Sequence, residues 1–235
     1  MSRIYDSVLG NLESPWVSLD VKFWGDLIKD APRRRIHADQ DIFWPGKEST
    51  AVYIVAGGRF CVRMIHESGF QKHVYIACPG AMIGETDCIL GCDHSMTATA
   101  IMESEVYCIP RMELMRQFQT NQTLASHLLR YGSRKNRMLI YQVSMLSFNK
   151  SSQRIASLLI CLCENYGMET EEGIYLNLRF TCAEMASIAN TSRVTANNTM
   201  LLLMEKGIVE KKHGKYLVKD LIRLHEIELG EMIEQ

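Results

Sequence analysis

The sequence of 235 residues has no apolar run that approaches the ~18 residues of a membrane span, and its N-terminus lacks the basic, apolar and small-residue order of a secretion signal. We therefore expect a cytoplasmic protein that makes no membrane contact. The sequence also lacks the GxxxxGK(S/T), HExxH and GxSxG motifs and a dinucleotide-binding fingerprint. Because its scattered acids form no convincing pair, we expect neither an enzyme nor a bound cofactor.

The sequence also has little net charge, −1 at neutral pH, which argues against wholesale binding to nucleic acid. A local excess of positive charge is present between Arg179 and Arg223, where eight Lys and Arg residues stand against four acids. A DNA-binding face would have to lie in this stretch. With 47% apolar and 23% charged residues, the composition is that of a folded chain, long enough for one large or two small domains.

Short strand-like runs separated by turn residues fill residues 36–110. "AVYIV" leads into Gly57-Gly58, "RFCVRMI" into the turn "HESG", and "KHVYIA" into Pro79-Gly80. Strands of about 4–8 residues with this spacing indicate an antiparallel sandwich or small barrel. Such a barrel has room for one small ligand.

Residues 111–148 change to helical periodicity, with no proline and one glycine. Positions that step by four and three residues form a heptad seam. The seam consists of Leu124, Leu128, Tyr131, Lys135, Met138, Gln142 and Met145. Two interpretations stay open: the helix packs on its own domain, or it pairs with the same helix of a second chain. In the second, Lys135 is a polar break that another group must satisfy.

Residues 151–235 predict three or four short helices and a hairpin. "SSQRIASLLICLCENYG" is an amphipathic helix that Ser151 or Ser152 caps and Gly167 ends. The hairpin is "IVEKKHGKYLV", two strands around His213-Gly214 that form a wing carrying Lys211, Lys212 and Lys215.

Between them, "TCAEMASIANTSRVTANNTMLLLMEKG" predicts a helix, a tight turn and a second helix. Thr181 and Glu184 form a capping box at the first helix, and Ser192 caps the second. On the second helix, one face points to the core and the opposite face groups polar side chains near the N-terminus. The core face holds Ala196, Thr199, Met200 and Leu203, and the opposite face holds Arg193, Val194, Asn197 and Asn198.

The opposite face suits a recognition helix in a DNA major groove better than an ordinary surface helix. The guanidinium of Arg193 can form two hydrogen bonds to guanine or to a phosphate. An asparagine can form two hydrogen bonds to adenine, and Val194 can contact the methyl group of thymine. The two helices resemble the winged helix-turn-helix of the Crp/Fnr family of bacterial regulators. "VYIVAGGRFCVRMI" and "PGAMIGE" resemble the β-roll sensor of the same family.

The resemblance covers residues 36–225 and implies an α+β fold: an N-terminal β-roll of the cyclic-nucleotide-binding type, a long dimerisation helix and a C-terminal winged helix-turn-helix. We place these domains at residues 1–123, 124–148 and 149–235. The resemblance further implies a homodimeric transcriptional regulator that binds double-stranded DNA and works with RNA polymerase. In the first ~30 residues, which hold Trp16 and Trp24, Asp20 can cap a helix, and the question whether that helix closes the ligand pocket stays open.

By the same resemblance, Thr181 and Ser192 touch DNA phosphates, and Arg193, Val194 and Asn198 reach bases. Thr195, Asn197 and Lys212 complete the expected DNA-binding set. Many family members carry Glu at the place of Val194 and Arg at the place of Asn198, and read a G·C pair. Valine cannot accept a hydrogen bond from cytosine, so we predict an A·T-rich palindrome of the TTAAT kind, with half-sites about one helical turn apart.

The ligand pocket departs from the family's cyclic-nucleotide site. His94, followed by Ser95, stands where an arginine would hold the phosphate, and a neutral histidine supplies no permanent charge. Leu139 and Ile140 replace the small hydroxyl residues that would meet adenine. An iron–sulfur sensor would need an N-terminal cysteine cluster, but the first cysteine is Cys61.

The expected pocket is aromatic and aliphatic with one lysine, which suits a small apolar ring with an acidic group. It is lined by Tyr75, Ile76, Gly84, Glu85, His94, Ser95, Tyr131, Lys135, Met138 and Leu139. The pattern is similar to the family branch that controls reductive dehalogenation genes, whose effectors are halogenated phenols. Shared features are the arginine-free "GE" turn, Tyr131-x3-Lys135 and Val194-Thr195. Because Glu85 would disfavour an anion unless it is paired, Lys135 from the partner helix is a candidate for that pair.

The eight cysteines are expected to be reduced and mostly buried. Cys88, Cys92 and His94 could bind zinc or form a redox disulfide, although a coincidence of spacing is the simpler interpretation, and we expect no metal. Cys182 starts a predicted helix, where oxidation would weaken DNA binding. The alternative functions are therefore a thiol-controlled regulator with a vestigial pocket and a cyclic-nucleotide-responsive regulator.

Overall fold

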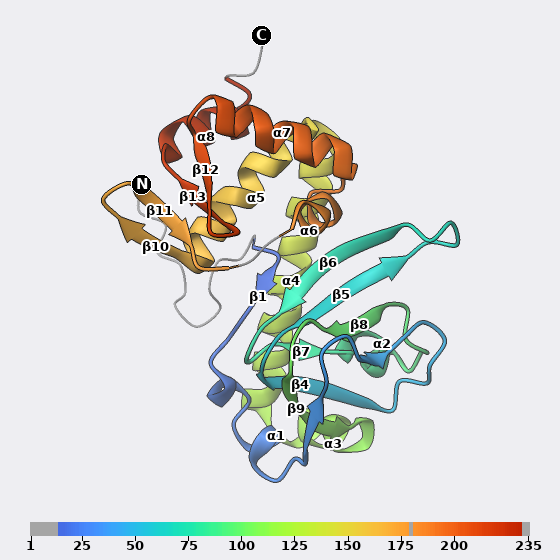
Figure 1. Cartoon of the computed structure of the whole chain (residues 1–235). Helices are drawn as coiled ribbons and strands as arrows, with labels where there is room; N and C mark the ends of the chain where they lie inside the picture. The colour runs from blue at the N-terminus through green and yellow to red at the C-terminus, as the bar shows by residue number, and fades with distance from the viewer. Residues whose placement is uncertain (1–13, 179–180, 232–235) are drawn as a thin grey trace. The chain divides into compact units, whose positions relative to one another are not determined.

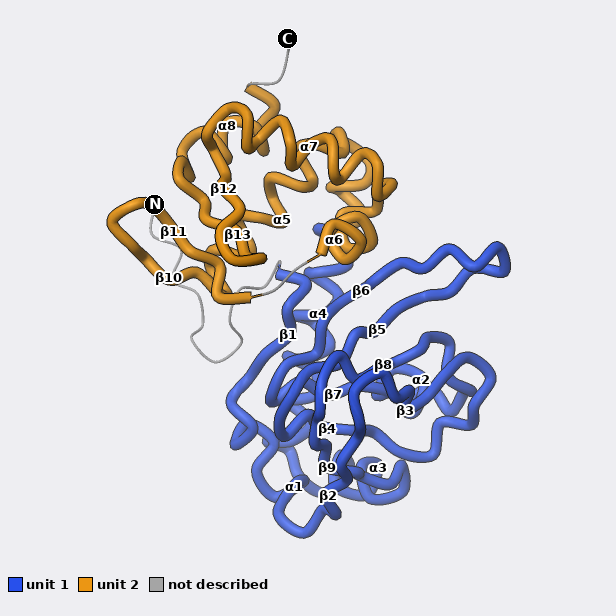
Figure 2. Tube along the Cα trace, viewed as in Figure 1, with its two compact units in different colours: residues 1–141 blue, residues 142–235 orange. Residues whose placement is uncertain are grey.

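The computed structural model describes residues 14–178 and 181–231 and divides the chain into two compact units, residues 1–141 and 142–235 (Figure 2). The division falls inside the long helix α4 (Gln122–Phe148). Among the helices of the described residues, none has both the length and the apolar character that crossing a membrane requires.

The first unit is built on two sheets that enclose one hydrophobic core (Figure 1). One sheet has the strand order β1-β6-β5-β8-β3 and the other β2-β9-β4-β7. The strands are β1 (Trp16–Val17), β2 (Arg33–Ile36), β3 (Asp41–Phe43), β4 (Ala51–Gly57), β5 (Phe60–Ile65), β6 (Gln71–Ala77), β7 (Met82–Ile83), β8 (Thr97–Ala100) and β9 (Ser104–Pro110). All pairings are antiparallel among the described residues except β1 with β6, so the roll expected from the turn spacing is confirmed.

The segment before the roll forms a 3₁₀ turn, η1 (Val21–Trp24), and a short helix, α1 (Asp26–Lys29). Asp20 accepts a hydrogen bond from the Lys22 amide at 2.9 Å, so it caps this segment as predicted. The Trp24 ring lies edge-on to Tyr131 of α4 at 5.3 Å, and its indole N–H donates to Gly80 O at 2.7 Å. The segment therefore packs on the roll and α4 rather than standing apart.

The helices α2 (Glu85–Leu90) and α3 (Arg111–Thr120) and the part of α4 up to residue 141 complete the first unit. Five residues of the predicted seam are buried within this chain: Leu124, Leu128, Tyr131, Lys135 and Met138. The apolar ones among them belong to the core of the roll. The interpretation of this seam as the dimer face is therefore wrong. A heptad spacing shows that one face is covered, but it does not show by what, and here the roll covers it.

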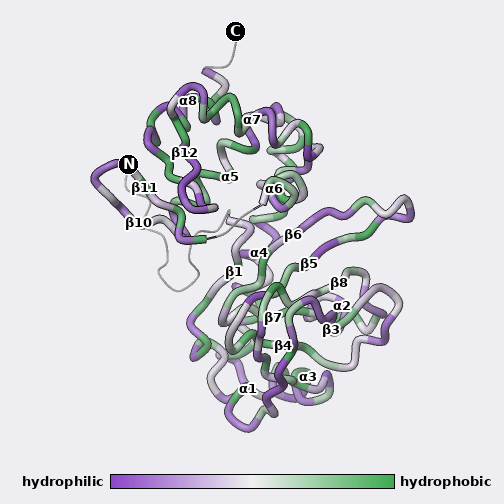
Figure 3. The backbone as a smooth tube through the Cα atoms, in the orientation of Figure 1, coloured by the Kyte–Doolittle hydropathy of each residue, from purple (hydrophilic) through white to green (hydrophobic). Residues whose placement is uncertain are grey.

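The second unit carries α5 (Ser151–Tyr166), α6 (Cys182–Ile188), α7 (Arg193–Glu205) and α8 (Leu221–Leu229) around a sheet of order β10-β11-β13-β12. The strands are β10 (Gly167–Thr170), β11 (Gly173–Leu176), β12 (Val209–Lys212) and β13 (Lys215–Val218). The predicted wing is β12–β13, which turns at His213-Gly214, both with positive φ. Apart from its first residue, the buried Val209, the chain along β12 is hydrophilic (Figure 3).

Two details of this unit differ from the sequence prediction. The hairpin β10–β11 was not predicted, because its polar first strand is exposed at every position. Helix α5 is capped at Lys150 rather than at Ser151 or Ser152, since Gln153 reaches back and accepts a hydrogen bond from the Lys150 amide at 2.7 Å. The predicted end of the helix at Gly167 is confirmed.

Candidate functional sites

A buried polar cluster lies inside the first unit, where β6, α2 and α4 meet. Lys135 Nζ donates to the Tyr75 hydroxyl at 2.8 Å and forms an ion pair with the Glu85 carboxylate. The lysine nitrogen also lies 4.3 Å from the centre of the Tyr75 ring, a cation–π contact. Because the side chains of Lys135 and Glu85 are only 10% and 9% exposed, each ion depends on the other for compensation.

The protonation states of this cluster follow from its burial. Burial acts to lower the pKa of Lys135, but Glu85 and Tyr131 raise it by more, so the pKa lies above its ordinary value and the ammonium stays charged. Burial, followed by the charge of Glu85, holds the pKa of Tyr75 well above 10.0, so its phenol stays neutral. The pairing of Glu85 that the sequence called for is present, but its lysine comes from the same chain. The expectation that Lys135 of a partner helix supplies it is wrong.

The start of α2 is shaped by Gly84, which caps the helix with a φ of +81°. A β-carbon at this position would lie 3.1 Å from Cε1 of His94 and 3.3 Å from the Phe43 ring. The backbone therefore packs closely against the His94 ring, which is itself stacked on Phe43 at 3.9 Å. This contact brings the predicted residues Gly84 and His94 together.

The anion contacts of this turn are occupied by an acid of the chain itself. Asp87 accepts hydrogen bonds from the Ser95 amide at 3.1 Å and the Ser95 hydroxyl at 3.0 Å. His94 Nδ1 lies 3.6 Å from Asp87 Oδ2. Burial lowers the pKa of His94, with Asp87 opposing the shift, so the ring tends toward its neutral form. Asp87 was not singled out from the sequence, because its partners become neighbours only in the folded turn.

The remaining predicted pocket residues lie in different surroundings. Tyr131 is buried, and its hydroxyl donates to Met82 O at 2.7 Å and accepts from Met82 N at 3.0 Å. Met138 is buried in the core, whereas Leu139 is 40% exposed. Ile76 follows Tyr75 on β6 and therefore points to the opposite face of the sheet. The structure thus groups Tyr75, Glu85 and Lys135 beside Tyr131, but it does not bring Ile76 or Leu139 to them.

The cysteines predicted as redox or metal ligands differ in exposure. Cys88 is fully buried and burial raises the pKa of its thiol, whereas Cys92 is exposed. Little reactive thiolate is therefore available at Cys88. Within residues 14–178 and 181–231, no group of three or more His, Cys, Asp or Glu side chains is arranged to hold a metal ion. Cys182 is half-buried, with its sulfur 3.8 Å from the Tyr216 hydroxyl.

The second unit presents the predicted helix-turn-helix. The Thr181 hydroxyl accepts from the Glu184 amide at 3.2 Å, and the Glu184 carboxylate accepts from the Thr181 amide at 2.7 Å, as a capping box requires. Ser192 accepts from the Thr195 amide at 2.9 Å and caps α7. Both predicted caps are confirmed, and both place hydroxyl groups at helix N-termini, where phosphates bind.

The two faces of α7 also follow the prediction. Ala196, Thr199, Met200 and Leu203 are buried. Arg193, Val194, Asn197 and Asn198 are exposed, Val194 by 69%. Thr195 is half-buried and its hydroxyl bonds that of Ser192 at 2.8 Å. The exposed face therefore holds the branched apolar side chain, the guanidinium and the two amides that the prediction of base recognition requires.

The wing lysines Lys212 and Lys215 already have partners within the chain, which the sequence alone does not indicate. Lys212 forms ion pairs with Glu172, in the β10–β11 turn, and with Glu210, the latter at 3.8 Å. Lys215 donates to Asn177 at 2.7 Å. Arg179 lies outside the described residues. Lys212 must therefore exchange an acid for a phosphate if it contacts DNA.

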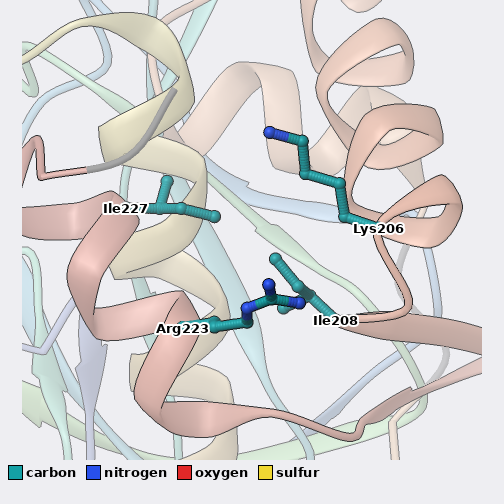
Figure 4. A pocket seen from close by; sticks show the side chains of 4 residues that line it. All are labelled: Lys206, Ile208, Arg223 and Ile227. Atoms are coloured by element: carbon teal, nitrogen blue, oxygen red, sulfur yellow. The ribbon is translucent and has the colours of Figure 1, made fainter. Parts of the chain in front are cut away.

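A small cavity of about 290 Å³ lies at the other end of α7 (Figure 4). Ile208 and Ile227 form its apolar wall, and Lys206 and Arg223 supply its charged side. Because the predicted base-reading residues occupy the N-terminal turns of α7, this cavity is separate from the predicted DNA-reading surface.

Two family descriptions match the chain. The cyclic nucleotide-binding domain matches residues 33–121, and the Crp-like helix-turn-helix domain matches residues 153–227, so together they cover more than half of the chain. The chain is 25% identical over 206 residues to the Cyclic AMP receptor protein of Thermus thermophilus, covering 87% of this chain and 92% of that protein. It is 22% identical over 195 residues to the Anaerobic regulatory protein of Bacillus subtilis, with 81% and 82% covered.

Solved structures agree on the fold. A CprK variant complexed with OCPA has a TM-score of 0.73 at 19% identity, covering 91% of this chain and 97% of that one. A CooA mutant from Carboxydothermus hydrogenoformans has a TM-score of 0.75 at 20% identity, covering 86% and 89%. The fold and its two sites define an effector-binding β-roll followed by a Crp-like helix-turn-helix. The chain belongs to the Crp/Fnr family and is a DNA-binding transcriptional regulator with an effector-binding domain.

Proposed function

We propose that this protein is a homodimeric regulator whose β-roll binds a small acidic aromatic effector, of the chlorophenol class, and that the bound form reads an A·T-rich palindrome. The observation that carries the proposal is the buried Lys135, held by Glu85 and Tyr75. An effector that binds one arrangement of α4 more tightly shifts the protein toward it and so changes the spacing of the two recognition helices.

The cluster favours an acidic aromatic ligand for two reasons. A phenolate or carboxylate can pair with Lys135 if Glu85 takes up a proton as the ligand binds, so that neither buried charge is left uncompensated. The ring of Tyr75, and that of Tyr131 at 5.7 Å from Lys135 Nζ, offer faces on which an aromatic ligand can pack. CprK, a solved structure of similar fold, is complexed with OCPA, so a protein of this fold binds a ligand.

A cyclic nucleotide fits the same turn poorly. Its phosphate would meet Asp87 rather than an arginine, because Ser95 already donates to that carboxylate. His94, which stands at the arginine position, is buried, and its pKa is lowered by that burial. A phosphate therefore gains no fixed positive charge there and faces a negative one.

The predicted response to ligands can be measured as a thermal shift of the reduced protein. We expect chlorinated phenols to raise the melting temperature, since a ligand at about 100 times its Kd stabilises by about 2.7 kcal/mol. Dechlorinated phenol should give a smaller rise and cAMP none. A rise with cAMP alone would contradict the proposed effector class. A protein that responds only to thiol oxidation would instead support the redox alternative, in which oxidation of Cys182 disturbs the neighbouring Thr181, a predicted phosphate contact.

Dimerisation is proposed through the face of α4 opposite its buried seam. Exposed apolar side chains lie on this face (Leu129, Ile140 and Val143) and along its edge toward the seam (Leu139 and Leu146), with exposures between 40% and 72%. Asn136, Ile140 and Val143 step by four and three residues, the spacing of a coiled coil with one polar position. A long helix that exposes such a stripe is suited to pairing with its own copy.

The replacement Ile140→Lys should disrupt the dimer. A buried isoleucine contributes about 1.5–3 kcal/mol, and a two-fold interface counts it twice, so the dimer Kd should rise roughly 100-fold or more. Sedimentation equilibrium measures this directly. Met112→Lys, at a residue of α3 that is 85% exposed, is the matched control and should remain dimeric. An Ile140→Lys protein with the wild-type dimer Kd would place the interface elsewhere.

A further inference from the structure

The first turn of α5 contains an arginine that joins two separate parts of the second unit. Arg154 donates from Nη1 to Asn149 O at 2.6 Å and from Nη2 to Ser151 Oγ at 3.2 Å. On its other side, Nε donates to Ala189 O at 2.7 Å and Nη2 to Asn190 O at 3.0 Å. A single guanidinium therefore holds the start of α5 and the end of α6 together.

The contacts with α6 fix the turn of the helix-turn-helix. Ala189 is the C-cap of α6, where backbone carbonyls lack helical partners and a cation is favoured by the helix dipole. Asn190 has a φ of +51°, which reverses the chain before Ser192 caps α7. Holding the carbonyls of Ala189 and Asn190 thus sets the direction in which α7 leaves the turn.

The contact of Arg154 with Asn149 fixes the start of α5 to the end of α4. Asn149 directly follows Phe148, the last residue of α4, and its amide still donates to Met145 O at 3.1 Å. A guanidinium is planar and presents its donors in a fixed fork, so its contacts cannot adjust independently as those of a lysine can. A change in direction at the end of α4 must therefore move the helix-turn-helix turn with it.

We infer that Arg154 is a positioning residue that couples the end of α4 to the recognition helix α7. The inference rests on the proposed function, in which effector binding acts on α4. Arg154 lies outside the effector cluster and on α5 rather than on α7, so its role is to transmit a direction and not to read bases.

Hydrogen exchange of the full-length protein tests the coupling without ligand or DNA. In Arg154→Lys, we expect the amides of Thr191, which bonds Ala186 O at 2.9 Å, and of Asn149 both to exchange faster, by about tenfold. Gln153→Ala is the matched control, because this neighbour on α5 bonds Lys150 and Glu228 but no residue of the turn. Gln153→Ala should leave the exchange of Thr191 unchanged.

Binding to selected palindromic DNA provides the functional readout. Arg154→Lys should lose about tenfold in affinity for the palindrome and keep its affinity for unrelated DNA, while Gln153→Ala keeps both. Faster exchange at Thr191 alone would mean a local helix cap and would overturn the coupling, as would unchanged exchange at both amides. If the wild-type protein selects no palindrome, the proposed function fails, and the two amides still decide the inference about Arg154.

Discussion

Replacing Lys135 by Met is expected to lower the free energy of unfolding of the first unit by about 3–5 kcal/mol, because removal of one partner leaves a buried charge uncompensated. Glu85 would remain in a site where its side chain is 9% exposed. For a unit of this size, the loss corresponds to a melting temperature lower by roughly 6–20 °C. Thermal and urea unfolding both measure it.

The reason for the loss can be tested by removing the second charge. The double variant Lys135→Met/Glu85→Gln should recover most of the stability, since neither ion is left alone and the methionine fills the lysine's space. Lys29→Met, the same substitution on an exposed lysine of α1, should change stability by no more than about 0.5 kcal/mol. If the single and double variants were equally unstable, packing and not charge would explain the role of Lys135.

The second large effect is expected in the DNA sequence that the protein selects. Val194→Glu should change the preferred base pair at one position of each half-site from A·T to G·C, because a carboxylate accepts a hydrogen bond from the cytosine amino group and valine cannot. Discrimination at that position should be about 1–3 kcal/mol per half-site. Selection from random double-stranded DNA, followed by affinity measurement at one fixed salt concentration, measures it.

A control on the same helix separates base reading from a general effect of charge. Leu201→Glu introduces the same carboxylate two turns along α7, at a side chain that is 46% exposed. It should weaken binding to all sequences without changing the preferred bases, since the N-terminal turns of a recognition helix reach the base edges. Selection of the same palindrome by wild type and Val194→Glu would show that Val194 does not contact a base.

The sequence predicts those parts of the fold that local signals determine. Hairpin glycines and prolines mark the strands of the roll, and the hydroxyl caps Thr181 and Ser192 mark the helices of the DNA-reading motif. The faces of α7 follow from helical periodicity alone. The first strand of the hairpin, β10, is exposed at every position, so no buried face of its own indicates that it pairs with β11.

The candidate effector site was less predictable, because its contacts are long-range. Lys135 and Glu85 are 50 residues apart, and the periodicity of α4 places Lys135 on a buried face without identifying what covers it. Asp87 meets His94 and Ser95 only after the turn has formed. The periodicity of α4 does not distinguish the exposed stripe of Ile140 and Val143 from the buried seam on the other side of the helix, because both have the same spacing.

The most direct test of the account is the affinity of the full-length protein for its selected palindrome, measured by fluorescence anisotropy with and without ortho-chlorophenol. Wild-type protein should bind the palindrome about tenfold more tightly or more weakly when the phenol is present, depending on which arrangement of α4 the phenol favours. Lys135→Met/Glu85→Gln, which keeps the fold but lacks the ion pair, should bind DNA and ignore the phenol. An equal response in the two proteins, or no response in wild type, would contradict the assignment of the effector site to Lys135.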